Sequence, residues 1–157
     1  MTILVTGGAG YIGSQTSRLL TSLGHEIVIL DSLERGNANS VMGAPLVIGD
    51  IADSVLVTDI CLKYQVTSVI HFAAYKSAGE SMSQPEMYWR NNVQGTVNLI
   101  EGMLAANVKH IVFSSSAAVY GNPQSSPISE ASAISPANVY AETKAMMERV
   151  IRWYGET

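Results

Sequence analysis

The feature that most constrains this chain is a regular alternation of short apolar runs with segments of helical periodicity. Strand-like runs are predicted at 3–5, 26–30, 46–48, 68–71 and 110–114, and helices at 11–23, 54–64, 91–106 and 139–154. This alternation indicates βαβ units and a parallel sheet. The runs are continuous in Val, Ile and Leu, as expected for strands covered on both faces. We therefore predict an α/β fold with a doubly wound parallel sheet.

The length and the apolar composition support one domain with a proper core. The chain has 157 residues, of which 47% are hydrophobic and only 14% are charged. Charged residues usually reach about 25% of a soluble domain, so either the sheet is buried on both faces or a large surface meets a partner. Two loops, 34–45 and 121–136, are rich in Asn, Ser, Gly or Pro. Long loops at strand ends are often functional.

Charge and cysteine content exclude several classes of protein. The net charge is −4 with no run of Lys or Arg, so we expect neither a nucleic-acid partner nor an anionic membrane partner. Cys61 is the single cysteine, is expected in the core, and fits a reducing cytoplasm. No targeting signal or membrane span is visible. The histidines at 25, 71 and 110 are far apart in sequence, so no metal site is predicted.

A glycine-rich loop follows the first predicted strand and opens the first predicted helix. Residues 7–13 read GGAGYIG, which fits the dinucleotide fingerprint with either Gly7 or Gly8 ahead of Gly10 and Gly13. Such glycines let the backbone approach a pyrophosphate at a helix N-terminus. Asp31 closes the second strand, where an acid accepts hydrogen bonds from the adenosine ribose. Its carboxylate would repel a 2′-phosphate, so NAD is favoured over NADP, and we expect nearby Arg35 to be solvated.

A tyrosine and a lysine four residues apart start the last predicted helix. Tyr140 and Lys144 share one helix face, and Ser116 lies just beyond the fifth strand. A tyrosine with an ordinary pKa of about 10 is a poor base, and bringing it near 7 takes about 4 kcal/mol. An ammonium group about 4 Å away supplies about 4 kcal/mol at an effective dielectric near 20. The pair, helped by a positive nicotinamide ring, can therefore supply a base at neutral pH, with Ser116 passing the proton.

With these three elements in this order, the chain resembles the extended short-chain dehydrogenases, whose sheet is Rossmann-type. Three stretches narrow the resemblance to the pattern of UDP-glucose 4-epimerases: HFAAYKSAGES at 71–81, NNVQGT at 91–96 and SSSAAVYG at 114–121. The resemblance covers essentially the whole chain. It implies an isomerase that interconverts UDP-glucose and UDP-galactose through a 4-keto intermediate, with hydride passing transiently to bound NAD.

The resemblance also implies a role for each matching residue. Ser116, Tyr140 and Lys144 would be catalytic, and Lys76, Ser116 and Tyr140 would contact the sugar. The cofactor would contact residues of the glycine loop, the strand ends and two helices, namely Gly7, Gly10, Tyr11, Ile12, Gly13, Asp31, Ser32, Asp50, Ile51, Phe72, Ala73, Ala74, Lys76, Asn91, Tyr140 and Lys144. Within this set Tyr11 and Ile12 would line the pyrophosphate, and Asp50 and Ile51 would flank the adenine.

The chain departs from the family pattern in a few residues and in length. Ala74, Tyr75 and the Glu34-Arg35 pair are unusual, but they remove no group that the chemistry needs. Family members continue for roughly as long again. We therefore expect residues 1–157 to be an incomplete NAD-binding domain that lacks the last strands and the substrate domain, and that is inactive alone. A full-length parent is expected to be a homodimer through the helices at 91–106 and 139–154.

Two other readings remain open. One is a related nucleotide-sugar epimerase or a 4,6-dehydratase, although the dehydratase needs an acidic pair where this chain has Ala117 and Ala118. The other is a dinucleotide-binding regulator without catalysis, since fold alone does not imply function. Such a regulator needs the glycine loop but not the serine, tyrosine and lysine.

Overall fold

The computed structural model describes residues 1–123 and 126–156, and these divide into two compact units. The sheet unit comprises residues 1–74 and 95–114. The helix unit comprises residues 75–94 and the chain from 115 onward.

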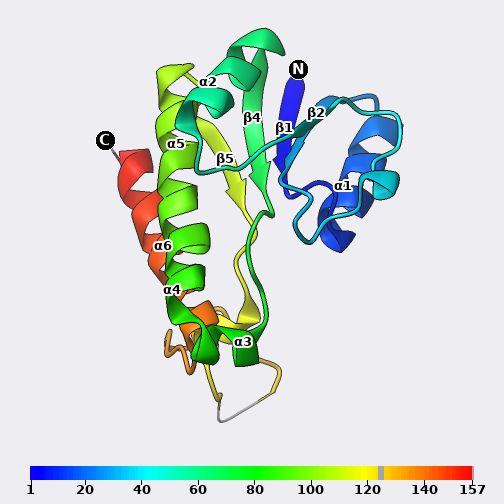
Figure 1. Cartoon of the computed structure of the whole chain (residues 1–157). Helices are drawn as coiled ribbons and strands as arrows, with labels where there is room; N and C mark the ends of the chain where they lie inside the picture. The colour runs from blue at the N-terminus through cyan, green and yellow to red at the C-terminus, as the bar shows by residue number, and fades with distance from the viewer. Residues whose placement is uncertain (124–125, 157) are drawn as a thin grey trace. The chain divides into compact units, whose positions relative to one another are not determined.

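The sheet unit holds five parallel strands in the order β3-β2-β1-β4-β5 (Figure 1). Their bounds are Thr2–Thr6 for β1, Glu26–Asp31 for β2, Leu46–Ile48 for β3, Val66–His71 for β4 and His110–Phe113 for β5. The strand order reverses between β1 and β4. In open parallel sheets this switch point opens a crevice at the carboxyl ends of the strands, where ligands bind. The predicted α/β fold is confirmed, with each strand within two residues of its expected position.

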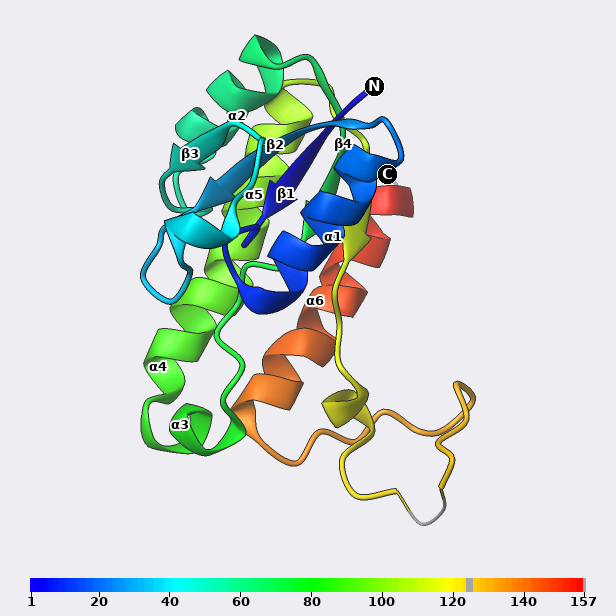
Figure 2. The same ribbon diagram turned by 90° about the vertical axis from the view of Figure 1, so that its right-hand side faces the viewer.

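Helices cover both faces of this sheet (Figures 1 and 2). On one face, α2 (Ser54–Lys63) and α5 (Gly95–Ala105) pack on a cluster that includes Leu4, Val28, Leu30 and Val69. On the other, Leu20 of α1 (Tyr11–Ser22) packs on the alternate side chains of β1 and β2. The strands are therefore apolar on both sides. Cys61 of α2 is 2% exposed, which confirms its expected place in the core.

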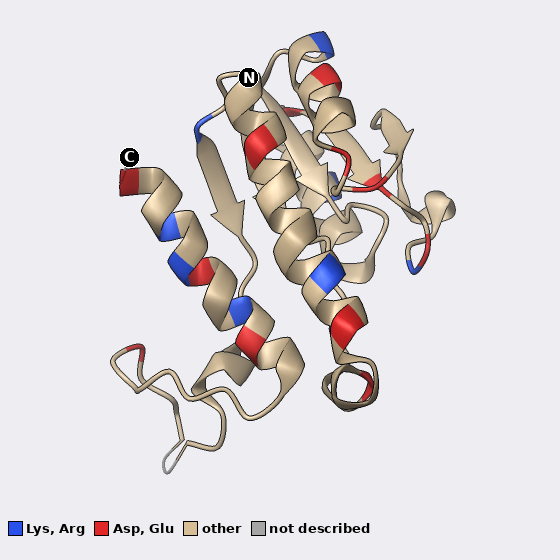
Figure 3. Ribbon diagram, turned by 60° about the vertical axis from the view of Figure 1, so that its left-hand side comes forward, with Lys and Arg blue, Asp and Glu red and all other residues tan. Residues whose placement is uncertain are grey.

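The helix unit consists of short helices and one long one. They are α3 (Ala78–Ser83), α4 (Pro85–Tyr88), a π-helical turn η2 (Trp89–Gln94), a 3-10 turn η3 (Ala117–Tyr120) and α6 (Val139–Glu156). The sheet unit adds one further 3-10 turn, η1 (Ala38–Ser40). Basic and acidic residues are both present along α6 (Figure 3). No helix in the described ranges is long and apolar enough to cross a membrane.

The predicted helix at 91–106 needs a correction. Residues 89–94 form a π-helical turn, and regular α-helix begins only at Gly95. The cause is visible at Asn92, whose side chain bonds the backbone of Tyr75 instead of facing solvent. The short helices α3 and α4 were not predicted, because segments of six and four residues carry too little periodicity to be recognised.

Candidate functional site

The glycine loop of the sheet unit has a backbone path that only glycine permits. Gly7 has a φ of 70°, and a Cβ there would lie 2.6 Å from the Ala73 nitrogen. A Cβ on Gly13 would overlap the Gly7 carbonyl oxygen. Gly10 is the N-cap of α1 and provides no side-chain cap. The first N–H groups of α1 therefore receive no side-chain cap from Gly10, and uncapped N–H groups at a helix start can bind a phosphate.

Asp31 ends β2 beside this loop and is 8% exposed. Its Oδ2 accepts a hydrogen bond from the Ala9 N–H at 2.9 Å, and its Oδ1 accepts one from the Leu33 N–H at 2.8 Å. The carboxylate is thus fixed against the glycine loop before any ligand arrives. Because a carboxylate has about four acceptor positions, capacity for ribose hydroxyls remains.

Gly36 is a site residue that the sequence reasoning missed. A Cβ on it would lie 2.7 Å from Asp31 Oδ1 and 2.9 Å from Ala9 Cβ. The next residue, Asn37, donates its N–H to the Ala9 carbonyl at 3.1 Å. Residues 32–37 therefore fold back on the glycine loop. In the sequence, only the glycine five positions after Asp31 indicates this close approach.

A pocket of about 320 Å³ opens between this returning loop and the first turns of α1. It is lined by residues of both segments, namely Ala9, Gly10, Tyr11, Ser14, Gln15, Arg18, Arg35, Asn37, Asn39, Ser40 and Met42. The side chains of Tyr11 and Ile12 are 80% and 57% exposed. Arg35, expected to be solvated, is exposed and borders this pocket.

The remaining predicted cofactor residues of the sheet unit follow strand ends. Asp50 and Ser32 are exposed, whereas Ile51 is buried. After β4, the Phe72 N–H donates to the Thr6 carbonyl at 2.9 Å, and the chain then passes against Gly7 at Ala73. The glycine loop, Asp31 and residues 72–74 thus meet at the carboxyl edge of the sheet.

The helix unit carries the predicted catalytic residues. Tyr140 is half-buried on the first turn of α6, and Lys144, one turn on, is 4% exposed. Burial lowers the pKa of Lys144 from 10.5 to about 8. Ser116 caps η3, and its Oγ accepts the Ala118 N–H at 3.2 Å. Ser115 donates to Glu148 of α6, so this segment is tied to the helix of Tyr140 and Lys144.

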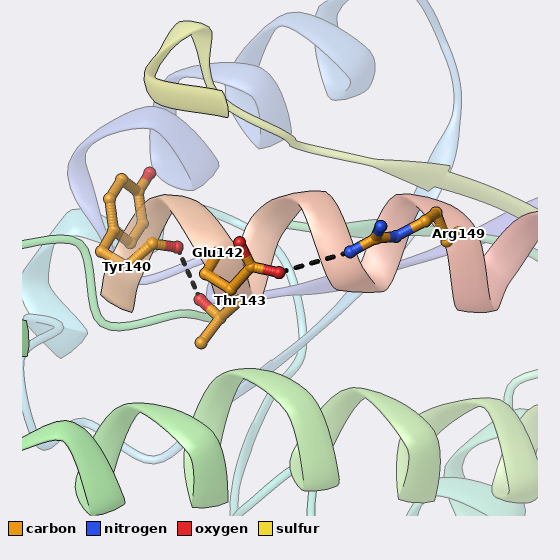
Figure 4. Close-up of polar contacts among 4 residues, drawn as sticks. All are labelled: Tyr140, Glu142, Thr143 and Arg149. Carbon is orange, nitrogen blue, oxygen red and sulfur yellow. Dashed lines mark hydrogen bonds and ion pairs between the residues drawn. The ribbon is translucent and has the colours of Figure 1, made fainter. Parts of the chain in front are cut away.

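Two polar contacts shape the start of α6 (Figure 4). The Tyr140 carbonyl accepts a hydrogen bond from Thr143 Oγ1 at 2.7 Å. Further along, Arg149 pairs with Glu142 at 3.3 Å on an exposed part of the helix. The phenol of Tyr140 takes no part in that ion pair.

Asn92 is a second residue that the sequence reasoning left without a role. It is 3% exposed, and its Oδ1 accepts the Tyr75 N–H at 2.9 Å. Its Nδ2 donates to the Tyr75 carbonyl and, at 3.2 Å, to Thr143 Oγ1. The neighbouring Asn91, predicted at the cofactor, donates to Asn92 at 2.8 Å, and Lys76 is exposed. The Asn91-Asn92 pair marks this place in the sequence. Asn92, and not Asn91, makes the contacts with Tyr75 and Thr143.

Comparison with known proteins places the chain in a family. Residues 3–157 match the NAD dependent epimerase/dehydratase family, and the chain belongs to it. It is 46% identical to a UDP-glucose 4-epimerase of Halalkalibacterium halodurans, covering 99% of this chain and 47% of that protein. The Bacillus subtilis UDP-glucose 4-epimerase is 43% identical over 97% of the chain.

The solved structures similar to this chain include UDP-glucose 4-epimerases as well. A UDP-glucose 4-epimerase from Brucella ovis in complex with NAD superimposes with a TM-score of 0.97 at 40% identity, covering 99% of this chain and 48% of that one. A UDP-Glc/GlcNAc 4-epimerase from Campylobacter jejuni gives a TM-score of 0.93 at 37% identity, with 99% and 49% covered. The chain spans about half the length of the relatives it matches.

Proposed function

We propose that this chain is the NAD-binding part of a UDP-glucose 4-epimerase, which interconverts UDP-glucose and UDP-galactose through a 4-keto sugar. One observation carries the proposal. Lys144 is buried one helical turn from Tyr140, in a chain 46% identical to a UDP-glucose 4-epimerase. Buried lysines are uncommon, and a perturbed lysine pKa is typical of functional sites.

The residues of the sheet unit fit NAD. A side chain at Gly7 would collide with the backbone of Phe72 and Ala73, and one at Gly13 with the Gly7 carbonyl oxygen, so the tight path of this loop requires glycine at both positions. At the start of α1 the N–H groups of Tyr11 and Ile12 would hold the pyrophosphate, and Asp31 would accept the ribose hydroxyls. Bound there, NAD would supply a reversible hydride acceptor for C4 of the sugar. Asp50, Ile51, Phe72 and Ala74 are proposed to complete the binding site, together with the residues named above.

The chain's own groups are proposed to move the proton. Tyr140 takes the proton of the sugar 4-hydroxyl and returns it after the sugar has turned over. Lys144, with its pKa near 8, is mostly protonated at pH 7 and stabilises the phenolate. The Ser116 hydroxyl donates a hydrogen bond to the reacting oxygen. Lys76 contacts the sugar and the cofactor, and Asn91 contacts the cofactor.

A second point is which UDP-sugars the enzyme accepts. The Campylobacter jejuni relative is a UDP-Glc/GlcNAc 4-epimerase, so N-acetylated UDP-sugars are the alternative substrates. Dehydration is disfavoured because Ala117 and Ala118 provide neither acid nor base after Ser116.

We also propose that the full-length protein is a homodimer through the helical segments at 91–106 and 139–154. These two ranges carry nine apolar positions that could meet a partner. Three of them, Ile100, Met103 and Met147, are buried within the chain and are therefore core residues. Leu104 is 44% exposed, and Val93, Val97, Met146, Val150 and Ile151 are half-buried. These six remain candidates for the interface. Sedimentation at micromolar concentration tests this proposal, and a strictly monomeric protein contradicts it.

The activity is proposed for a protein of the relatives' full length that carries this chain. We expect such a protein to convert UDP-galactose to UDP-glucose, measured by separating the two sugar nucleotides. The 157-residue chain assayed alone is expected to be inactive, since alignment of the sugar is worth about 7–11 kcal/mol and needs contacts beyond these residues. A full-length protein that binds NAD but does not convert the sugar would favour the alternative of a dinucleotide-binding regulator without catalysis.

A further inference from the structure

The motif Gly79-Glu80-Ser81 has no role in the proposed function, yet the structure connects it to the catalytic helix. Ser81 lies in α3 and is fully buried. Its Oγ accepts a hydrogen bond from the Tyr140 N–H at 3.1 Å. The two residues are 59 positions apart, so this contact belongs to the tertiary structure of the helix unit.

The Tyr140 N–H needs a partner from outside its own helix. Tyr140 is the second residue of α6, and the first four N–H groups of a helix have no acceptor within it. Asn138 accepts from Ala141 at 2.9 Å, one residue further on. Ser81 therefore supplies the acceptor that the helix itself cannot give to Tyr140.

Other contacts hold Ser81 in place. Its hydroxyl donates to the Ala78 carbonyl at 2.6 Å, which directs its lone pairs outward from α3. Tyr88, fully buried, donates to Glu80 Oε2 at 2.7 Å and accepts the Ser77 N–H at 3.0 Å. The Tyr88 phenol thus connects Ser77, the N-cap of α3, with Glu80 inside the helix. Ser81 directly follows Glu80 in the chain.

Tyr140 is held on its other side as well. Its carbonyl accepts from Thr143, and Thr143 is bonded by Asn92. Both peptide groups of Tyr140 are therefore fixed by buried residues. The direction of the Tyr140 phenol then depends only on the torsion angles of its side chain.

We propose that Ser81 is a positioning residue for Tyr140, and that Glu80 and Tyr88 act through it. This inference rests on the proposed function. Removing the Ser81 oxygen leaves the Tyr140 N–H without this acceptor and frees the first turn of α6. The phenol then moves relative to Lys144, and a displacement of about 1 Å in a catalytic geometry can cost about a hundredfold in rate.

The test compares Ser81→Ala with Ser83→Ala in the full-length, NAD-loaded enzyme. Ser83 lies in the same helix, is exposed, and donates only to the Glu80 carbonyl. We expect Ser81→Ala to lower kcat at least about tenfold with KM and NAD affinity unchanged, and Ser83→Ala to match the wild type. The acidic limb of the kcat pH profile should also move to higher pH, because the phenol would lie farther from the charge of Lys144. A smaller folded fraction would instead lower the measured rate without moving this limb.

Tyr88→Phe provides a second variant that leaves Ser81 intact. It should lower kcat less than Ser81→Ala does, and it should have little further effect in the Ser81→Ala background, because both act on one contact. A Ser81→Ala enzyme with wild-type kcat and pH profile, or fully additive effects, overturns the role of Ser81. An inactive wild-type protein would instead contradict the proposed function, and this inference with it.

Discussion

The two units of this protein differ in what fills their interiors. In the sheet unit, Val, Ile and Leu from five strands form two apolar clusters, one on each face. In the helix unit, Lys144 is buried, and several other buried residues are polar and hydrogen-bonded, as at Ser81, Asn92 and Thr143. Apolar burial stabilises without direction, whereas a buried polar group must meet its partner. The sheet unit is therefore suited to holding a cofactor framework, and the helix unit to fixing single groups.

The largest expected effect is in the helix unit. In a full-length enzyme, Tyr140→Phe should lower kcat by about 10²–10⁴-fold, because a general base contributes that much. NAD should remain bound, since the binding framework of the sheet unit is untouched. Tyr154→Phe on the same helix is the matched control and should behave as wild type. Turnover by Tyr140→Phe at the wild-type rate would refute the mechanism.

The pH dependence of stability should have opposite signs in the two units. Lys144 of the helix unit has its pKa lowered by burial to about 8 from 10.5, so its unfolded form binds more protons between these values. Stability should therefore rise as pH climbs from 8 to 10.5, by roughly 3 kcal/mol in full. Lys144→Met should remove this rise, and exposed Lys109→Met should not, in denaturant titrations at each pH.

Cys61 of the sheet unit should act the other way. Burial raises the pKa of its thiol from 9.0 to about 11, so the folded state binds more protons in that window. Its contribution to stability is present below pH 9 and is lost as pH rises through 11. Cys61→Ala should abolish this loss, although it lowers stability at neutral pH by leaving a small cavity. Identical pH slopes for the wild type and both variants would contradict the difference between the units.

A smaller effect tests one of the buried polar residues of the sheet unit, His71. Its Nδ1 lies 2.6 Å from Thr6 Oγ1, its Nε2 lies 2.9 Å from Thr96 Oγ1, and it is 1% exposed. His71→Leu should destabilise the fold by about 2 kcal/mol, because two buried hydroxyls lose this partner. Exposed His110→Leu, at the start of β5, is the control. Equal unfolding midpoints for the two variants would show that the sheet relies on apolar packing alone.

The smallest expected effect concerns cofactor choice at Asp31. Calorimetric titration should show NAD binding at least about tenfold tighter than NADP, since the carboxylate repels a 2′-phosphate about 4 Å away by about 1 kcal/mol or more. Asp31→Asn should narrow this ratio, and Asp59→Asn on the exposed side of α2 should leave it unchanged. Equal wild-type affinities would count against the assignment of Asp31.

Much of the sheet unit could be predicted because its information is local. The Val-Ile-Leu runs predicted every strand, the GGAGYIG loop lies where it was expected, and Asp31 ends β2 beside it. The Tyr140-Lys144 pair was also evident, because a spacing of four is a property of one helix. None of these needed knowledge of distant residues.

Only the tertiary structure decided which polar groups meet. Gly36 lies against Asp31, Asn92 bonds Tyr75 and Thr143, and Ser81 receives the Tyr140 N–H. Short helices such as α3 lack periodicity, and a serine or asparagine has no preferred partner in sequence. Hydrogen bonds join atoms about 3 Å apart whatever their separation along the chain. The sequence by itself therefore determined the sheet and the chemical groups, and folding alone decided how Tyr140 and its neighbours are held.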